Sequence, residues 1–106
     1  MHFFLEMMKK ILPTGWFPAS EAESKALQDE LQKELPQGHL LFGQDVEVIA
    51  HRDGATDDIL VRHVGEPERY TVIHLTWAGR REVDPHPSVE VDGSWEDFLD
   101  YERGFE

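Results

Sequence analysis

The sequence contains no cysteine, which excludes disulfide bonds, thiol catalysis, iron–sulfur clusters and thiolate zinc sites. It also has no apolar run that approaches the roughly 20 residues of a membrane-spanning helix. The apolar N-terminal residues include Glu6 and precede Lys9 and Lys10, the reverse of the charge order in a secretory signal. We therefore predict a cytoplasmic protein that has no membrane partner.

Basic residues are also scarce in this chain. Lys and Arg number 10 against 22 Asp and Glu, and the net charge is −12. Between Glu82 and Glu106 there are nine acidic residues and one arginine. Such a surface repels phosphate backbones, so we expect no nucleic-acid partner. It attracts a basic protein, although an acidic surface that serves only solubility has the same composition.

The length of 106 residues is that of one domain, and 40% hydrophobic with 30% charged residues is a globular composition. We predict a single α+β domain over residues 1–106. Residues 1–11 are expected to be an N-terminal extension, either flexible or produced by a misassigned start, because Met7 and Met8 offer later starts. The segment Leu12–Pro18 has the composition of a turn-rich aromatic loop.

A helix is predicted to follow Ser20. Ser20 and Glu23 have the spacing of a capping box, in which each side chain bonds a backbone amide of the first turn. Leucines recur every four residues and form a narrow stripe that one face of the helix would bury. They are Leu27, Leu31 and Leu35. Pro36 and Gly38 end the helix.

Three β-branched segments follow, and turn residues such as Asp53 and Gly54 separate them. They are Asp45–Arg52, Asp58–Val64 and Tyr70–Trp77. Their short connections predict an antiparallel meander. A fourth strand, Ser88–Asp92, is predicted at an edge of the sheet because Pro85 and Pro87 precede it.

Ser94 is predicted to cap a short helix over Trp95–Glu102, whose aromatic and leucine residues have helical spacing. The fold class is therefore α+β: an N-terminal helix, a three- to four-stranded antiparallel meander and a short C-terminal helix packed on one face of the sheet. We expect the two helices to share that face, because their apolar stripes need a common surface.

The six histidines do not belong to a zinc-binding motif such as H-E-x-x-H. We predict no metal and no cofactor, and we favour surface or hydrogen-bonded histidines over a metal site built with nearby carboxylates. His51 and His63 would converge in only one register of the first hairpin, and the sequence does not reveal the register. The acidic segment Asp53–Asp58 fails the EF-hand pattern, because Asp58 stands where that loop needs glycine.

His74 lies in the middle of the third strand. Strand alternation places it with Tyr70, Val72 and Thr76, opposite the face of the predicted core residues Ile73, Leu75 and Trp77. It therefore points to solvent or to a second packing layer. A general base at this position would need an orienting carboxylate and a substrate pocket. The sequence names no such carboxylate, and a structural histidine is the favoured interpretation.

Trp77, Arg80 and Arg81 stand at the end of the same strand. An indole and two guanidinium groups suit a planar or anionic ligand, through stacking and bidentate hydrogen bonds. The alternative is that the arginines pair with acidic residues of the C-terminal helix, at Glu96 or Asp100. No catalytic residue is predicted. The predicted binding residues are His74, Thr76, Trp77, Arg80 and Arg81.

The segment His74–Gly79, followed by Glu82 and by Ser94–Phe98, resembles a group of small uncharacterised bacterial proteins. Their pattern is an aromatic start, a helix, a V-H-L-T-W-x-G strand, a proline-containing acidic segment and an S-x-x-x-F helix. Trp16–Pro18 corresponds to the aromatic start, and the resemblance covers most of the chain. It implies a bacterial cytoplasmic protein and transfers no activity. Asp84–Pro87 lacks the tryptophan of this family. If that residue lines a pocket in relatives, the resemblance does not carry the pocket over to this chain.

The leading hypothesis is a protein-interaction module that binds a basic partner, one form of which is an immunity-type inhibitor of a basic toxin. The second is a small-molecule-binding protein or minor enzyme that uses an open sheet face around His74, Thr76 and Trp77. The third is a homodimer across that open face, with apolar strand residues at its centre. Those residues are Val46, Val48, Leu60 and Val72.

Overall fold

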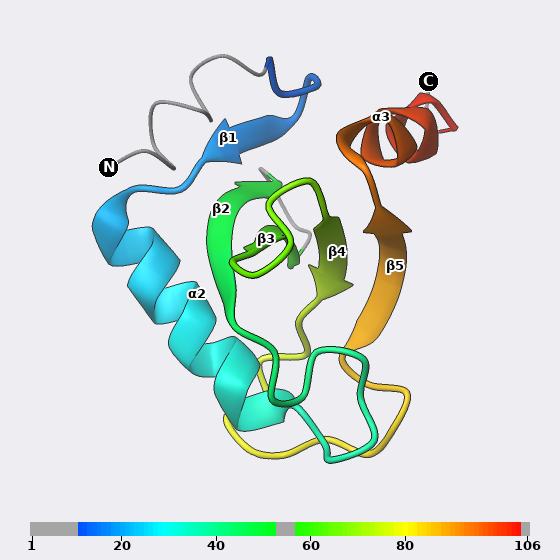
Figure 1. Ribbon diagram of the computed structural model, residues 1–106. Coiled ribbons are helices and arrows are strands. Elements are labelled where there is room, and N and C mark those ends of the chain that lie inside the picture. The colour runs from blue at the N-terminus through cyan, green and yellow to red at the C-terminus, as the bar shows by residue number, and fades with distance from the viewer. Residues whose placement is uncertain (1–10, 53–56, 105–106) are drawn as a thin grey trace.

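The computed structural model describes residues 11–52 and 57–104 (Figure 1). In chain order the elements are β1 (Trp16–Pro18), α2 (Glu21–Glu34), β2 (Val46–Arg52), β3 (Asp58–His63), β4 (Tyr70–His74), β5 (Ser88–Gly93) and α3 (Trp95–Arg103). The strands form one antiparallel five-stranded sheet in the order β1-β2-β3-β4-β5. The predicted α+β class, with a helix before the meander and a short helix after it, is confirmed.

The sheet has one strand more than the predicted upper count of four. The extra strand is β1, which lies in the predicted loop and pairs with the end of β2, with Trp16 opposite Arg52. Its three residues are too few for an alternating pattern to be recognised, and it ends in a proline. Of the predicted extension only Ile11 belongs to the described residues, and the turn at Asp53 and Gly54 lies outside them.

Both helices begin with the predicted local signals. At α2 the Ser20 hydroxyl accepts from the Glu23 amide at 3.1 Å, and the Glu23 carboxylate accepts from the Ser20 amide at 2.8 Å. At α3 Ser94 and Asp97 make the same pair of bonds, at 3.1 and 2.9 Å. These contacts span three residues of sequence, and this short range made them predictable.

The two helices cover opposite faces of the sheet, so the expectation that they share one face is wrong. The helix α2 packs in a cluster of Leu31, Leu35, Leu41, Val46, Val48, Ile59, Val61, Ile73 and Leu75. The helix α3 packs in a cluster of Trp16, Ile49, Ala50, Leu60, Tyr70, Val72 and Phe98. The cause lies in β3, where Ile59, Leu60 and Val61 are consecutive and all buried. A strand that is apolar on both faces needs a covering layer on each side, as Figure 1 shows.

The predicted open sheet face is therefore occupied within the chain itself. The four residues expected at a homodimer interface are at most 1% exposed in the single chain: Val46, Val48, Leu60 and Val72. A dimer centred on them is not supported, because their surface is already buried. In the described part of the chain, no helix is long and apolar enough to cross a membrane.

The pairing of β4 with the edge strand β5 contains one irregularity that matters below. Val72 lies opposite Val91, whereas the next residue, Ile73, lies opposite Val89. Glu90 is thus the extra residue of a β-bulge. A bulge interrupts the alternation of a strand and changes the direction of the extra side chain.

Candidate functional site

Two adjacent aspartates beside the start of β3 hold two of the predicted binding residues. Asp58 lies opposite His74 in the register, and its Oδ1 is 2.8 Å from His74 Nδ1. Asp57 Oδ1 accepts a 2.9 Å hydrogen bond from the indole Nε1 of Trp77. Asp58 is therefore the orienting carboxylate that the sequence did not identify.

The imidazole of His74 is partly accessible, with 45% of its side chain exposed. Strand alternation puts it on the face of Tyr70 and Val72, and its exposure shows that it meets solvent, one of the two predicted environments. The hydrogen bond that His74 Nδ1 makes to the Asp58 carboxylate raises the pKa of His74; burial lowers it by less, and the charges of Asp58, Asp57 and Glu90 raise it further. The ring therefore favours its charged form beside Asp58.

Arg52 fixes the second oxygen of Asp58. Its Nε donates to Asp58 Oδ2 at 3.0 Å, while its two terminal nitrogens donate to the Glu102 carboxylate of α3 at 3.0 and 2.8 Å. The guanidinium also lies 4.6 Å from the centre of the Trp16 ring. These contacts join β2, β3 and α3, and they raise the pKa of Arg52, chiefly through Glu102. Asp58 is consequently held by a cation on one oxygen and by an imidazole on the other.

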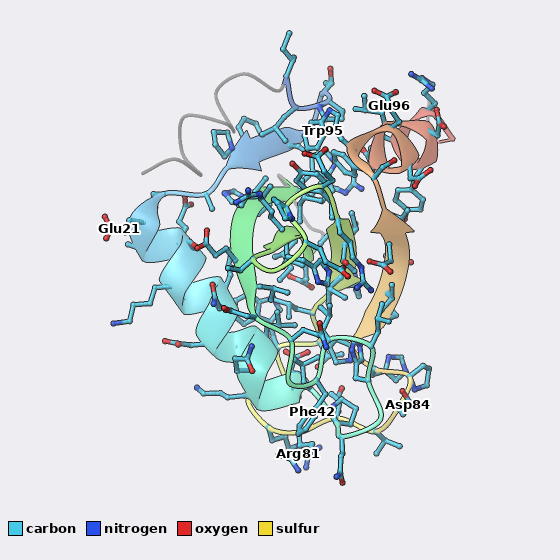
Figure 2. All side chains as sticks on the ribbon, in the orientation of Figure 1. Glu21, Phe42, Arg81, Asp84, Trp95 and Glu96 are labelled. Carbon is cyan, nitrogen blue, oxygen red and sulfur yellow. The ribbon has the colours of Figure 1, made fainter. Side chains whose placement is uncertain are left out.

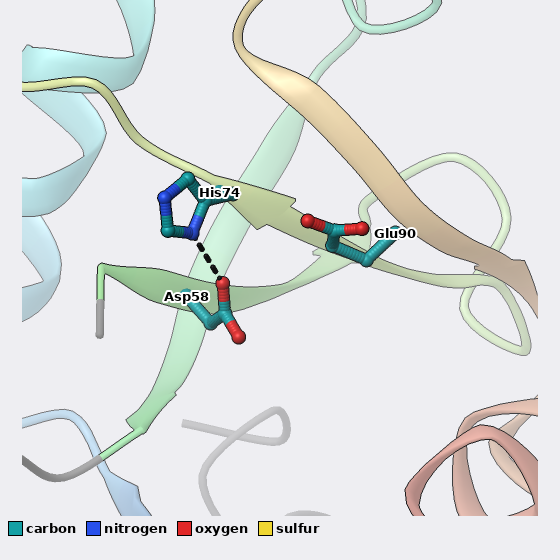
Figure 3. Close-up of side chains that lie close together, drawn as sticks. All are labelled: Asp58, His74 and Glu90. Carbon is teal, nitrogen blue, oxygen red and sulfur yellow. Dashed lines mark hydrogen bonds and ion pairs between the residues drawn. The ribbon is translucent and has the colours of Figure 1, made fainter. Parts of the chain in front are cut away.

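Glu90 completes the group at this site. Donor atoms of Asp58, His74 and Glu90 all lie within 4.8 Å of one another. Figure 3 shows the Glu90 carboxylate turned toward the His74–Asp58 pair. Burial, and then the charges of Glu90 and Asp58, raise the pKa of Tyr101 on α3, as expected for a phenol close to carboxylates. One imidazole and two carboxylates from three neighbouring strands thus share a small volume.

The segment after β4 is anchored by two glutamates of α2. The Glu34 carboxyl group, which is fully buried, accepts from the backbone amides of Thr76 at 2.9 Å and Trp77 at 2.8 Å. Glu30 accepts from the amide of Gly79 at 2.9 Å. Trp77 has a φ of 59°, in the left-handed region that a bulky residue rarely adopts. The Glu34 bonds to the amides of Thr76 and Trp77, and the Glu30 bond to Gly79 beyond it, stabilise that conformation.

The two anchoring carboxyl groups also contact each other and titrate as a pair. Burial, followed by the hydrogen bond with Glu30, raises the pKa of Glu34. The same hydrogen bond lowers the pKa of Glu30. The directions are opposite because burial disfavours the charged form of Glu34, the more deeply buried partner, more than that of Glu30.

Trp77 forms one wall of a hollow of about 290 Å³ between α2 and the first hairpin. The indole is 50% exposed. Other residues of the hollow are Glu23, Ala26, Leu27, His51, Arg52, Asp57, Asp58 and Ile59. His51 Nε2 lies 3.3 Å from the Glu23 carboxylate across the hollow's edge. Apolar side chains and the carboxylates of Glu23, Asp57 and Asp58 line the hollow together, and the role of Trp77 in a ligand site stays a prediction. The exposed indole contradicts the prediction that Trp77 belongs to the core.

Arg80 and Arg81 are exposed and stand apart from this group. Figure 2 places Arg81 beside Phe42 at the opposite end of the molecule from Glu96. Among the described ion pairs none includes Arg80 or Arg81, and Asp100 pairs with Arg103 of its own helix. The predicted salt bridges to the C-terminal helix are therefore not formed. Thr76 is exposed, and its hydroxyl accepts from the Ala78 amide at 3.3 Å.

Two further histidines are structural, as the favoured interpretation predicted. His39 is buried, and its Nε2 lies 2.6 Å from the carbonyl oxygen of Pro87. His63 is buried with its Nε2 2.8 Å from the Thr71 hydroxyl, and burial lowers its pKa. His51 and His63 do not converge, because they stand at opposite ends of the β2–β3 pairing.

Several important residues were missed from the sequence, and only some of them had a detectable signal. Glu30 and Glu34 occupy positions three residues after Leu27 and Leu31, inside the stripe that the helix buries. Acidic residues at such positions indicate a buried polar contact. Glu90 had no comparable signal, because its direction depends on the bulge.

Comparison of the chain with protein-family models, with curated proteins and with solved structures gave no match. The resemblance to small bacterial proteins carrying a V-H-L-T-W-x-G strand therefore stays a prediction.

Proposed function

We propose that this protein is an interaction domain that binds a basic protein through the surface formed by β5 and α3. The observation that carries the proposal is the charge of this surface. The segment Ser88–Gly104 holds six acidic residues and one basic residue, Arg103. Five of the acidic side chains are exposed: Glu90, Asp92, Glu96, Asp97 and Asp100.

Part of this charge has no neutralising partner in the described chain. Asp92 pairs with Arg69, and Asp100 pairs with Arg103. No described ion pair includes Glu90 or Glu96. The β5–α3 surface consequently keeps a net negative charge that a complementary cationic surface would neutralise.

The position of β5 adds geometric support. It lies at the end of the sheet order and hydrogen-bonds to β4 on one side only. The acidic residues of β5 and α3 therefore stand along an edge that a partner can approach directly. Charges on an edge strand also discourage pairing between identical acidic copies, which favours a partner of opposite charge. An immunity-type inhibitor of a basic toxin, acting in the cytoplasm, is one specific form of this function.

The experiment compares two variants of equal total charge. Glu96→Lys with Asp100→Lys alters α3, whereas Glu21→Lys with Asp29→Lys alters α2, and Figure 2 places Glu21 and Glu96 on different sides of the molecule. Each pair replaces one first-turn acid and one exposed mid-helix acid. Untagged protein is immobilised and exposed at low salt to a lysate of the organism that encodes it, and retained proteins are quantified by mass spectrometry.

The expected result is a basic protein that the wild type and the α2 variant retain and the α3 variant loses. With that protein purified, raising the salt should lower the association rate by about tenfold or more. Retention of no protein by the wild type, or equal retention by the two variants, would contradict the proposal.

A small-molecule-binding protein is the second candidate, and the hollow beside Trp77 favours it. Its volume of about 290 Å³ lies near the lower end for ligand pockets, and its lining combines apolar side chains with three carboxylates and one guanidinium group. The sheet face that was predicted to be open is covered by α3, so the hollow beside Trp77 is the proposed small-molecule site instead. A thermal-shift screen of small cationic and aromatic compounds tests this candidate. A stabilising compound must lose its effect in Trp77→Ala, and a screen without such a compound counts against it.

A further inference from the structure

We propose that Asp58, His74 and Glu90 bind one divalent transition-metal ion, with Zn²⁺ as the best match. This inference shares Glu90 with the acidic interaction surface, but it rests on the geometry of three side chains and not on the charge of that surface. The observation behind it is that donor atoms from three adjacent strands lie within 4.8 Å of one another. One imidazole nitrogen and two carboxylate oxygens are ligands that zinc accepts.

The sheet positions the ligands: Asp58 and His74 occupy paired positions, and Glu90 lies between two paired residues of β5. Asp58 and His74 are directly opposite in the β3–β4 register, and β5 pairs with β4 beside them. Metal sites need ligands that are held before the ion arrives, and regular strands hold side chains better than loops do. The three ligands therefore need only small side-chain movements to surround an ion.

The bulge in β5 is the most informative detail. Glu90 is the extra residue between Val89 and Val91, so it does not follow the simple alternation of the strand. The Glu90 carboxylate therefore faces His74 and Asp58 and supplies the third ligand of the site (Figure 3). Bulges are frequent next to functional sites because they redirect single side chains in this way.

An outer layer of contacts orients Asp58. Arg52 Nε holds Asp58 Oδ2 at 3.0 Å and leaves Oδ1 directed at His74 Nδ1. Glu102 binds the remaining guanidinium nitrogens and so neutralises the positive charge of Arg52. Such second contacts to a ligating carboxylate are usual in metal sites. Because Glu102 offsets the charge of Arg52, the negative charge of the neighbouring Asp57 adds to that of the ligands and favours a divalent cation.

The chemistry of the three ligands selects the kind of ion. A nitrogen ligand disfavours Mg²⁺ and Ca²⁺, which prefer all-oxygen coordination. The ion would take the place of the proton that lies between His74 Nδ1 and Asp58 Oδ1, and that proton is released to solvent. Three protein ligands leave at least one coordination position for water or for a ligand from another molecule.

The test measures binding of Zn²⁺ and of Co²⁺ to the untagged protein. Isothermal titration calorimetry should give one Zn²⁺ per chain, and bound Co²⁺ should show visible absorption typical of coordination by protein ligands. Glu90→Gln and His74→Gln should each weaken Zn²⁺ binding by at least about 10- to 100-fold, the range seen when even outer contacts of a metal site are removed. Mg²⁺ should not compete.

Two control variants separate this site from adventitious binding to other histidines and carboxylates. His51→Gln removes another histidine with a carboxylate neighbour, and Glu96→Gln removes an exposed carboxylate of α3. Both should bind Zn²⁺ like the wild type. Absence of saturable Zn²⁺ binding by the wild type would overturn the proposal, as would unchanged binding by Glu90→Gln or an equal loss in His51→Gln. Circular dichroism and unfolding curves confirm that each variant is folded.

Discussion

Replacement of Glu34 by alanine should destabilise the protein more than any replacement of an exposed residue on the same helix. Glu34 is fully buried and accepts backbone hydrogen bonds from Thr76 and Trp77. Each amide that loses its acceptor costs about 1–2 kcal/mol when partly shielded from water. The higher helix propensity of alanine returns a few tenths of a kcal/mol. The free energy of unfolding should therefore fall by about 2–3 kcal/mol.

Urea unfolding followed by tryptophan fluorescence measures this loss of unfolding free energy, and two further variants serve as comparisons. Glu34→Gln keeps one acceptor oxygen and should cost about 1 kcal/mol. Asp29→Ala removes an exposed carboxylate from the same helix and should change stability by less than about 0.5 kcal/mol. The Trp77 emission should shift to the red in Glu34→Ala, because the segment that positions this indole loses its anchor.

The reasoning would be refuted by a cost below about 1 kcal/mol for Glu34→Ala. An equal cost for Asp29→Ala would refute it too, since the effect would then belong to the helix and not to the two amide bonds. A loss for Glu34→Gln as large as that for Glu34→Ala would show that charge, and not the acceptor oxygens, is responsible.

Other predictions concern the histidines and the α3 layer. In NMR titrations with a chelator present, His63 should titrate below its ordinary pKa of 6.5 and His74 above it. The stability from neutral His63 is then present above pH 6.5 and lost as the pH falls through its folded pKa, so His63→Gln should flatten that decline. The His74 contribution has the opposite sign: it is present below pH 6.5 and lost as the pH rises through the folded pKa, which His74→Gln should abolish in the same unfolding series. Phe98→Ala should lower the free energy of unfolding by about 3–5 kcal/mol, because Phe98 is 1% exposed and fills the α3 layer. Ser94→Ala should cost about 1 kcal/mol through loss of the cap, and calorimetry can rank the two.

Of the three residues in the proposed metal site, the sequence predicted one as a site residue, His74, and did not predict its two partners. His74 was recognised as unusual because a polar residue interrupts an apolar strand. Its partners were not recognised, because Asp58 and Glu90 are 16 residues away on either side and only the strand register joins them. Register depends on packing and turn geometry, which a single sequence does not express.

The layering of the sheet is a second case. The run of Ile59, Leu60 and Val61 indicates a strand, but the prediction that both helices cover the same face of the sheet is wrong. An apolar stripe on each of two helices indicates that each helix packs against an apolar surface. The stripes do not indicate whether the two helices pack on the same face of the sheet. The consecutive apolar residues of β3 are the feature of the sequence that indicates burial of both faces.

The sequence by itself determined the caps, the order of elements from α2 to α3, the antiparallel meander and the acidic character of the C-terminal segment. These properties depend on residues a few positions apart or on composition, and their physical causes are local. Only the tertiary structure decided that α2 and α3 lie on opposite faces, that Glu34 holds Thr76 and Trp77, and that Glu90 meets His74 and Asp58. Each of these joins residues far apart in sequence, and such contacts exist only once the strands have paired and the core has closed.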